Sequence, residues 1–248
     1  MFTLSASAYQ VLWERLALPQ MPIELLVRPR GVEAHERRAE IERALEELRA
    51  KGLLDRGEAH PELSAALWLL ADPESTVDGR LWNARVLAGR AKGRAVLSVL
   101  ADDRFTVRWI DPGDLARAAV SVLPPLAAGP GQAVNVPSEV LGTAARAAGE
   151  SEWAMVDALS AAGVPSGDAR RLGNMIRGRS NGAQFGATVR QQRGSHVVAS
   201  FDTPAGRYLI EERRGWTTVA PADAQRISAR VDQVLAELVS RSRRAGSR

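Results

Sequence analysis

Residues 109–117 read WIDPGDLAR, and residues 218–226, which lie 109 positions later, read TVAPADAQR. Each stretch ends a segment with strand-like alternation and then carries a proline, a residue favoured in the first turn of a helix. The same offset aligns Leu25 with Val134, and each of these residues lies in a short segment that we expect to be extended. The sequence therefore predicts a degenerate internal repeat of about 110 residues.

The expected elements flank these two stretches in the same order in both halves of the chain. The first half should contain an N-terminal amphipathic helix, an extended segment at 22–27, helices over 33–51 and from Pro61, strands over 76–86, 94–101 and 104–110, and a helix from Asp111-Pro112. The second should contain an extended segment at 133–136, helices from Ser138, Ser151 and Ser166, strands over 183–190, 195–201, 206–212 and 215–219, and a helix from Pro221. Runs of helices followed by runs of strands favour an α+β fold with an antiparallel sheet.

The best linker in the sequence is PPLAAGPG, residues 124–131, because prolines and glycines interrupt both helices and strands. We therefore expect an N-terminal α+β half, residues 1–126, and a C-terminal α+β half, residues 127–248. Their strands should join one central antiparallel sheet with pseudo-twofold symmetry, so that the two halves form one compact unit.

Composition excludes several classes of protein. The 248 residues are 45% hydrophobic and 25% charged, which is ordinary for a globular protein, and none is cysteine. A disulfide framework, a cysteine-ligated metal site and thiol catalysis are therefore excluded. No apolar run is long enough to span a membrane, and the N-terminus lacks the basic start of a signal peptide. We expect a cytoplasmic protein that does not insert into membranes.

The net charge of +4 comes from the C-terminus. Removal of the tail over 241–248 would leave a balanced chain, because this tail contributes four arginines: Arg241, Arg243, Arg244 and Arg248. The tail follows the last inward-facing residue of the final helix, Leu238, and has no apolar period of its own. We expect it to be disordered.

No set of residues in the sequence matches a known catalytic or metal-binding pattern. The three histidines are scattered singly, and Lys92 is followed by glycine and arginine rather than by the hydroxyl residue of a phosphate-binding loop. The pairs Asp102-Asp103 and Glu211-Glu212 lie at expected strand ends, where neighbouring side chains point to opposite faces. We therefore expect neither an enzyme nor a cofactor.

A basic nucleic-acid-binding adaptor is the alternative function. Over residues 168–193, six arginines stand against one carboxylate, that of Asp168: Arg170, Arg171, Arg177, Arg179, Arg190 and Arg193. Such an adaptor could use these arginines together with the C-terminal tail. The aromatic residues of a single-stranded nucleic-acid platform are absent apart from Phe185, which argues against nucleic acid as a partner.

Several motifs resemble those of the EspG family. Residues 181–190, NGAQFGATVR, are similar to the Gly-Gln-Phe-Gly strand of that family, and residues 202–208 and 215–223, DTPAGRY and GWTTVAPAD, resemble its next strands and the start of its final helix. The opening helix with Trp13, the segment LPQMPI at 18–23, the charged helix over 33–51 and the strand VDGRL at 77–81 are similar as well. In order and spacing, the resemblance extends over residues 1–240.

EspG proteins are cytosolic chaperones of the type VII, or ESX, secretion system of actinobacteria. The resemblance implies two quasi-symmetric halves around a central sheet, with helices packed on it and a helical bundle formed mainly by the second half. It implies no catalysis. It implies instead that the chain binds the apolar helical tip of a PPE-like protein in a PE–PPE heterodimer, keeps this client soluble and targets it for secretion. Both a monomer and a homodimer are compatible with the sequence.

The resemblance also implies a contact surface made of a hairpin loop of the first half, the sheet face and the bundle. The hairpin loop corresponds here to residues 85–93, and its candidate contact residues are Arg85, Val86, Leu87, Arg90 and Lys92. Apolar residues beside cations suit an apolar tip with a polar rim. The bundle corresponds to residues 138–178, where Arg170, Arg171 and Arg177 are further candidates.

Overall fold

The computed structural model of the protein describes residues 1–148 and 151–245. The strands are β1 (Phe2–Ser5), β2 (Leu54–Asp55), β3 (Glu58–Ala59), β4 (Ser75–Leu81), β5 (Ala84–Ala91), β6 (Arg94–Ala101), β7 (Arg104–Ile110), β8 (Val134–Pro137), β9 (Ser180–Val189), β10 (Gln192–Arg193), β11 (Val198–Thr203), β12 (Gly206–Arg213) and β13 (Trp216–Pro221). The helices are α1 (Ala6–Arg15), the 3-10 helix η1 (Ile23–Leu25), α2 (Ala34–Ala50), α3 (Pro61–Ala71), α4 (Leu115–Val120), α5 (Ser138–Ala148), α6 (Glu152–Ala161), α7 (Ser166–Ile176) and α8 (Ala224–Ala245).

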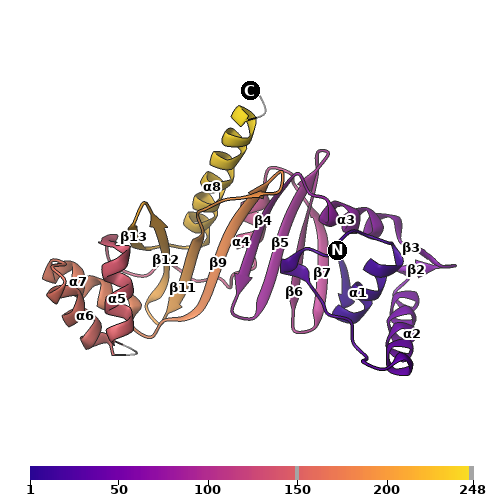
Figure 1. Ribbon diagram of the computed structural model, residues 1–248, viewed down its shortest axis with the longest axis horizontal. Coiled ribbons are helices and arrows are strands. Elements are labelled where there is room, and N and C mark those ends of the chain that lie inside the picture. The colour runs from indigo at the N-terminus through magenta and orange to yellow at the C-terminus, as the bar shows by residue number, and fades with distance from the viewer. Residues whose placement is uncertain (149–150, 246–248) are drawn as a thin grey trace.

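One sheet continues through both halves of the chain (Figure 1). In the described part of the chain it has 11 strands, in the order β1-β7-β6-β5-β4-β9-β11-β12-β13-β8, with β10 paired to β9. Its neighbouring strands are antiparallel throughout, and β4 of the first half joins β9 of the second. The prediction of one shared antiparallel sheet in an α+β fold is therefore confirmed.

The β4–β9 pair lies at the centre of the pseudo-twofold symmetry. Ser75 pairs with Val189 at one end, and Leu81 pairs with Ala183 at the other. The middle pair joins Asp78 to Gly186, which lies 108 positions later, close to the offset of the sequence repeat. On either side of this pair the strand order is the same when it is read outward, so β1 is the counterpart of β8 and α4 is the counterpart of α8.

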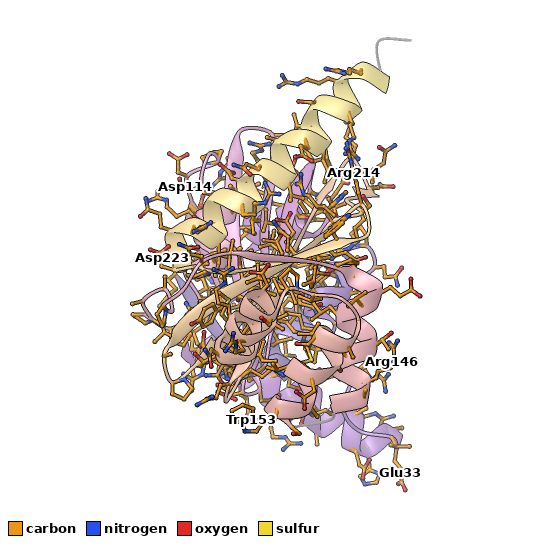
Figure 2. All side chains as sticks on the ribbon, turned by 90° about the vertical axis from the view of Figure 1, so that its left-hand side faces the viewer. Glu33, Asp114, Arg146, Trp153, Arg214 and Asp223 are labelled. Atoms are coloured by element: carbon orange, nitrogen blue, oxygen red, sulfur yellow. The ribbon has the colours of Figure 1, made fainter. Side chains whose placement is uncertain are left out.

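Three apolar clusters hold the layers together. On one face of the sheet, α4 and α8 cover a cluster that includes Val77, Val86 and Phe185. On the other face, α1 and α3 cover the first-half strands with Leu12, Leu67 and neighbouring side chains. At the far end of that second face, α5, α6 and α7 form a helical bundle against β8, β12 and β13. Figure 1 shows the bundle and the first-half helices at opposite ends of the sheet, and Figure 2 looks onto the bundle end.

The N-terminus differs from the sequence-based prediction. Residues 2–5 form the edge strand β1 rather than the start of a helix, and α1 begins only after Ser5, whose hydroxyl accepts a hydrogen bond from the backbone N–H of Ala8 at 3.0 Å. The segment expected to be extended at 22–27 contains η1 instead. The counterpart of β8 is therefore β1, which is too short for a period-two pattern to stand out from the helix that follows it.

The expectation of a disordered tail from residue 241 is wrong as far as the structure describes it. Helix α8 continues to Ala245, and only residues 246–248, which include Arg248, lie outside the described part. A guanidinium nitrogen of Arg241 lies 4.0 Å from the Glu237 carboxylate one turn earlier. The positive charges of arginines in the last turn also interact favourably with the negative end of the helix dipole. These two interactions stabilise the helix beyond Leu238.

The linker between the halves is held against β12. The carbonyl oxygens of Pro124 and Pro130 accept hydrogen bonds from the Arg207 guanidinium at 3.0 Å and from the Tyr208 hydroxyl at 3.0 Å. The backbone of Arg207 also bonds to Ala127 and Gly129. A Cβ atom on Gly129 would lie 2.1 Å from the Tyr208 ring, so only glycine fits there. The division at residue 126 stays a prediction.

The part of the chain that the structure describes contains neither a membrane-spanning helix nor a cluster of metal-binding side chains. Over 1–148 and 151–245, no helix has both the length and the apolar character needed to cross a membrane. Across the same residues, no group of three or more histidine, aspartate or glutamate side chains is placed to hold a metal ion.

Candidate partner-binding groove

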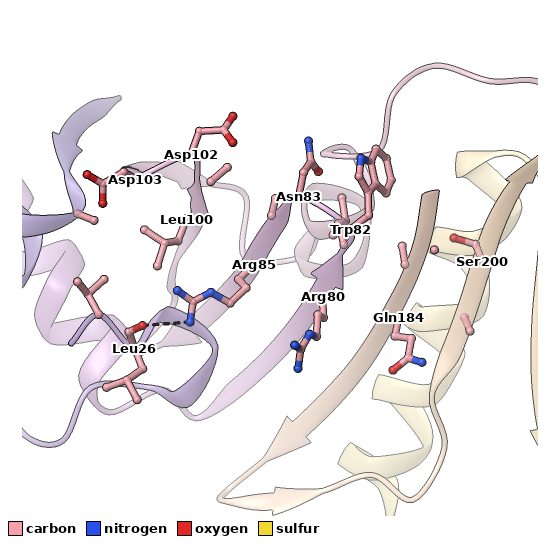
Figure 3. Close-up of a pocket in the computed structure, with 18 of the residues that line it drawn as sticks. Leu26, Arg80, Trp82, Asn83, Arg85, Leu100, Asp102, Asp103, Gln184 and Ser200 are labelled. Carbon is pink, nitrogen blue, oxygen red and sulfur yellow. Dashed lines mark hydrogen bonds between the residues drawn. The ribbon is translucent and has the colours of Figure 1, made fainter. Parts of the chain in front are cut away.

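A groove opens on the middle of the sheet, between the first-half helices and the bundle. Two adjoining hollows of about 1070 Å³ and about 440 Å³ form it, and they share Arg80, Arg85 and Gln184 in their lining. The wall on the first-half side includes Leu26 and Arg30 from the segment after η1. Figure 3 shows the larger hollow, with the side chains of β4, β5 and β9 along its floor.

The strand register explains why the floor is polar. One transverse row on this face, from β6 to β12, consists of Leu100, Arg85, Arg80, Gln184, Ala199 and Ile210, each paired with the next across the sheet. Beyond this row, Phe105 on β7 and Val219 on β13 are buried under the flanking helices. The three central positions of the row, Arg85, Arg80 and Gln184, are therefore polar, and the row becomes apolar toward the strands that the flanking helices cover.

The charges in the groove are only partly paired. Arg85 donates from Nη1 to the backbone oxygen of Leu26 at 3.0 Å. The carboxylate of Asp78 is engaged by Arg193, with distances of 2.6 and 2.9 Å between the oxygens and the two guanidinium nitrogens. Among the described residues, Arg80 has no hydrogen bond or ion pair (Figure 3).

Arg193 reaches Asp78 by crossing the backbone of β9. A Cβ atom on Gly186 would lie 2.5 Å from its Nη2 atom, so a glycine is needed at the centre of the sheet. Glu24 on η1 lies 4.0 Å from Nη1 of Arg193, the nitrogen that is 2.6 Å from Asp78. Burial raises the pKa of the Glu24 carboxyl, the nearby Asp78 carboxylate raises it further, and Arg193 and a backbone hydrogen bond oppose the shift.

Exposed apolar side chains surround this polar floor. Ile23 is 76% exposed, Leu26 is 42% exposed and Trp82 is 42% exposed, and all three line the groove or its continuation beside η1. A surface that combines a large aromatic, aliphatic side chains and arginines is typical of sites at which proteins bind one another.

The structure places only one of the five hairpin candidates in this groove. Residues 85–93 are not a loop, because residues 84–91 form strand β5, so the expected hairpin loop is wrong. Arg85 lines the groove. Val86 and Leu87 are buried on opposite faces of the sheet. Arg90 donates to the backbone oxygen of Pro112 at 3.2 Å, under α4.

Lys92, the fifth candidate, lies in the turn between β5 and β6, at the other end of β5 from Trp82. The segment 76–86 was expected to be a single strand, yet it contains the turn at Trp82 and Asn83. The chain therefore reverses at residues 82–83, before the loop that was expected at 85–93. A run of 11 residues is long for a strand, and the asparagine in it was the available signal.

The bundle candidates lie outside the groove. Arg170 and Arg171 are exposed on α7, where Arg171 forms an ion pair with Asp168, and Arg177 follows the end of that helix. Arg193, in contrast, is bound to Asp78 at the centre of the sheet. The arginines of residues 170–193 are therefore not gathered on one surface, and a contact role for Arg170, Arg171 and Arg177 stays a prediction.

Sequence reasoning missed the residues that the register brings together. Arg80 on β4 and Trp82 in the following turn are close in sequence, but Gln184 on β9 lies 104 positions after Arg80. No local motif marks these three residues. Leu26 reaches the groove only because η1 turns the chain across β5.

Comparisons with known proteins agree with this architecture. The EspG family model matches residues 5–233. The solved structure of the type VII secretion system chaperone EspG5 from Mycobacterium tuberculosis, in complex with the PE25–PPE41 dimer, has a TM-score of 0.75, with 17% identity over 96% of each chain. A search of curated proteins finds no match. Because the family model covers nearly the whole chain, this protein belongs to the EspG family.

Proposed function

We propose that this protein is a cytosolic chaperone of a type VII (ESX) secretion system. It binds the apolar helical tip of a PPE-like protein in a PE–PPE heterodimer, keeps that client soluble and targets it for secretion. The observation that carries the proposal is the open groove on the sheet face of an EspG-family chain, with apolar side chains around a polar floor.

The likeness to EspG5 supports this proposal. That chaperone was solved in complex with the PE25–PPE41 dimer, and it has the same fold over 96% of both chains. The flanking helices here leave a trough on the sheet rather than an enclosed pocket, which suits the end of a helical hairpin better than a small molecule. The function needs no catalytic step.

Apolar burial at the rim should supply most of the affinity. Trp82, Leu26 and Ile23 are exposed in the free protein, so a partner that covers them removes their apolar surface from water. Removal of apolar surface from water is favourable by about 25 cal/mol per Å², from which the entropic cost of association is subtracted. Tryptophan is among the residue types that most often dominate such contacts.

The test is capture of the native partner by the full-length protein from the cytosol, followed by mass spectrometry of what copurifies. Trp82→Glu should abolish capture of a PPE-like protein, because the new carboxylate would have to be desolvated in an apolar contact. Trp68→Glu is the matched control, because Trp68 is 49% exposed on α3 and does not line the groove. Equal capture by both variants, with unchanged melting temperatures, would contradict the proposal.

A further inference from the structure

Two arginines stand side by side on the groove floor in an arrangement that folding alone disfavours. Arg80 on β4 pairs directly with Arg85 on β5, and both side chains line the larger hollow. Like charges in directly opposite positions of an antiparallel pair are destabilising. Figure 3 shows both guanidiniums on the same side of the strands, with the amide of Gln184 next in the row.

The neighbouring carboxylates do not neutralise these two arginines. Asp78 is bound to Arg193, and Asp103 forms an ion pair with Arg30 at 2.6 Å. Glu24, which lines the smaller hollow together with both arginines, lies 4.0 Å from the Arg193 guanidinium. Asp102 also lines the groove, but it lies at the β6–β7 turn, on the far side from the Arg80 guanidinium in Figure 3. The pair therefore leaves positive charge on the floor beneath an apolar rim.

We propose that Arg80 and Arg85 anchor an acidic side chain carried on the tip of the bound client, with the amide of Gln184 as a further hydrogen-bond donor. This inference rests on the proposed function and adds the chemistry by which the client is selected. A guanidinium binds a carboxylate through two parallel N–H bonds, and the pair strengthens as the client excludes water.

The anchor also provides selectivity against other apolar surfaces. An apolar tip without a carboxylate would bury two guanidiniums with no opposite charge, which opposes its binding. Apolar contacts at Trp82 and Leu26 then supply affinity, while the arginine pair decides which tips are accepted.

The experiment measures the affinity of the full-length protein for its copurified PPE-like partner at about 0.05 M and about 0.5 M salt. Wild-type affinity should fall as salt rises. Arg80→Gln should weaken binding about tenfold or more at low salt and flatten the salt dependence, because one charge-assisted contact is lost. Arg108→Gln is the matched control, since Arg108 is an exposed strand arginine that does not line the groove, and it should behave as wild type.

An exchange of charge between Arg80 and the client tests their contact directly. Arg80→Glu should abolish binding, and replacement of one acidic residue of the client tip by arginine should restore it in that variant alone. The anchor would be overturned if Arg80→Gln bound with the affinity and salt dependence of the wild type. It would also be overturned if the variant lost affinity with unchanged salt dependence, because that result would indicate a neutral carbonyl ligand. If Trp82→Glu abolishes binding while Arg80→Gln does not alter it, the anchor fails and the chaperone function stands. If neither variant alters binding, both fail.

Discussion

Arg207 is the charged side chain whose loss should destabilise this protein most. Its side chain is fully buried, and its Nε and Nη2 atoms lie 2.6 and 3.2 Å from the two oxygens of Asp202. The same Nη2 atom donates to the carbonyl of Pro124, so the ion pair also fastens the linker to β12.

Arg207→Met would leave the buried Asp202 carboxylate without its countercharge. Removal of one partner of a buried pair costs about 3–5 kcal/mol, and the lost bond to Pro124 adds about 1 kcal/mol. For a chain of this size each kcal/mol lowers the melting temperature by about 2–4 °C. We therefore expect a fall of about 10 °C or more, measured by thermal unfolding and checked by urea titration.

The double variant Arg207→Met with Asp202→Leu is the control. Apolar side chains of similar size often replace a buried ion pair at little cost. Here the Nη1 atom of Arg207 has no hydrogen-bond partner among the residues that the structure describes, so the pair is not fully satisfied. The double variant should recover most of the lost stability. If the single variant costs less than about 1 kcal/mol, the buried pair is not what holds the linker, and the reasoning is refuted.

Three further predictions concern residues that the structure reassigned or whose pKa it shifts. Leu87→Asp should lower the melting temperature strongly, because Leu87 is 3% exposed and an unpaired charge there costs several kcal/mol; a variant as stable as wild type would return Leu87 to the surface. Glu24→Gln should stabilise the protein at pH 7 and have less effect near pH 4, since a native pKa raised above 4.5 means that ionisation of Glu24 destabilises the fold as pH rises; unfolding curves at the two pH values check this sign. Truncation after Ser240 removes the last turn of α8, in which none of the side chains described at 241–244 is a buried apolar one, so the melting temperature should change by less than about 4 °C.

Much of the fold could be predicted because its signals are local. The helix over 34–50, the helix that begins at Pro61 and the strands at 94–101 and 104–110 follow from periodicity, capping and turn residues. The repeat around residues 109 and 218 corresponds to two strand-to-helix corners in equivalent positions. The β1 strand was missed because four residues at an edge carry too short a pattern.

The groove could be predicted only in outline. The resemblance to the EspG family implied a contact surface that includes a hairpin of the first half, and Arg85 of that hairpin does line the groove, but Val86 and Leu87 proved to be core residues. The misplaced turn at Trp82 accounts for this error, because residues expected in a loop lie instead in the central strand β5, where apolar clusters cover both faces. Helical continuation through Arg241 was missed because the tail has no apolar period, and its arginines instead suit the end of a helix.

The sequence by itself determined the two-half organisation, the α+β class and the resemblance to the EspG family, because these depend on local patterns and on the order in which they follow one another along the chain. Only the tertiary structure decided which residues meet on the open face of the sheet. Arg80, Arg85 and Gln184 become neighbours through the pairing of β4 with β5 and β9, and pairing between distant strands depends on the register of the whole sheet. The physical reason is that a local pattern fixes which face of an element is apolar, whereas the partner of each element is fixed by how all the faces pack together.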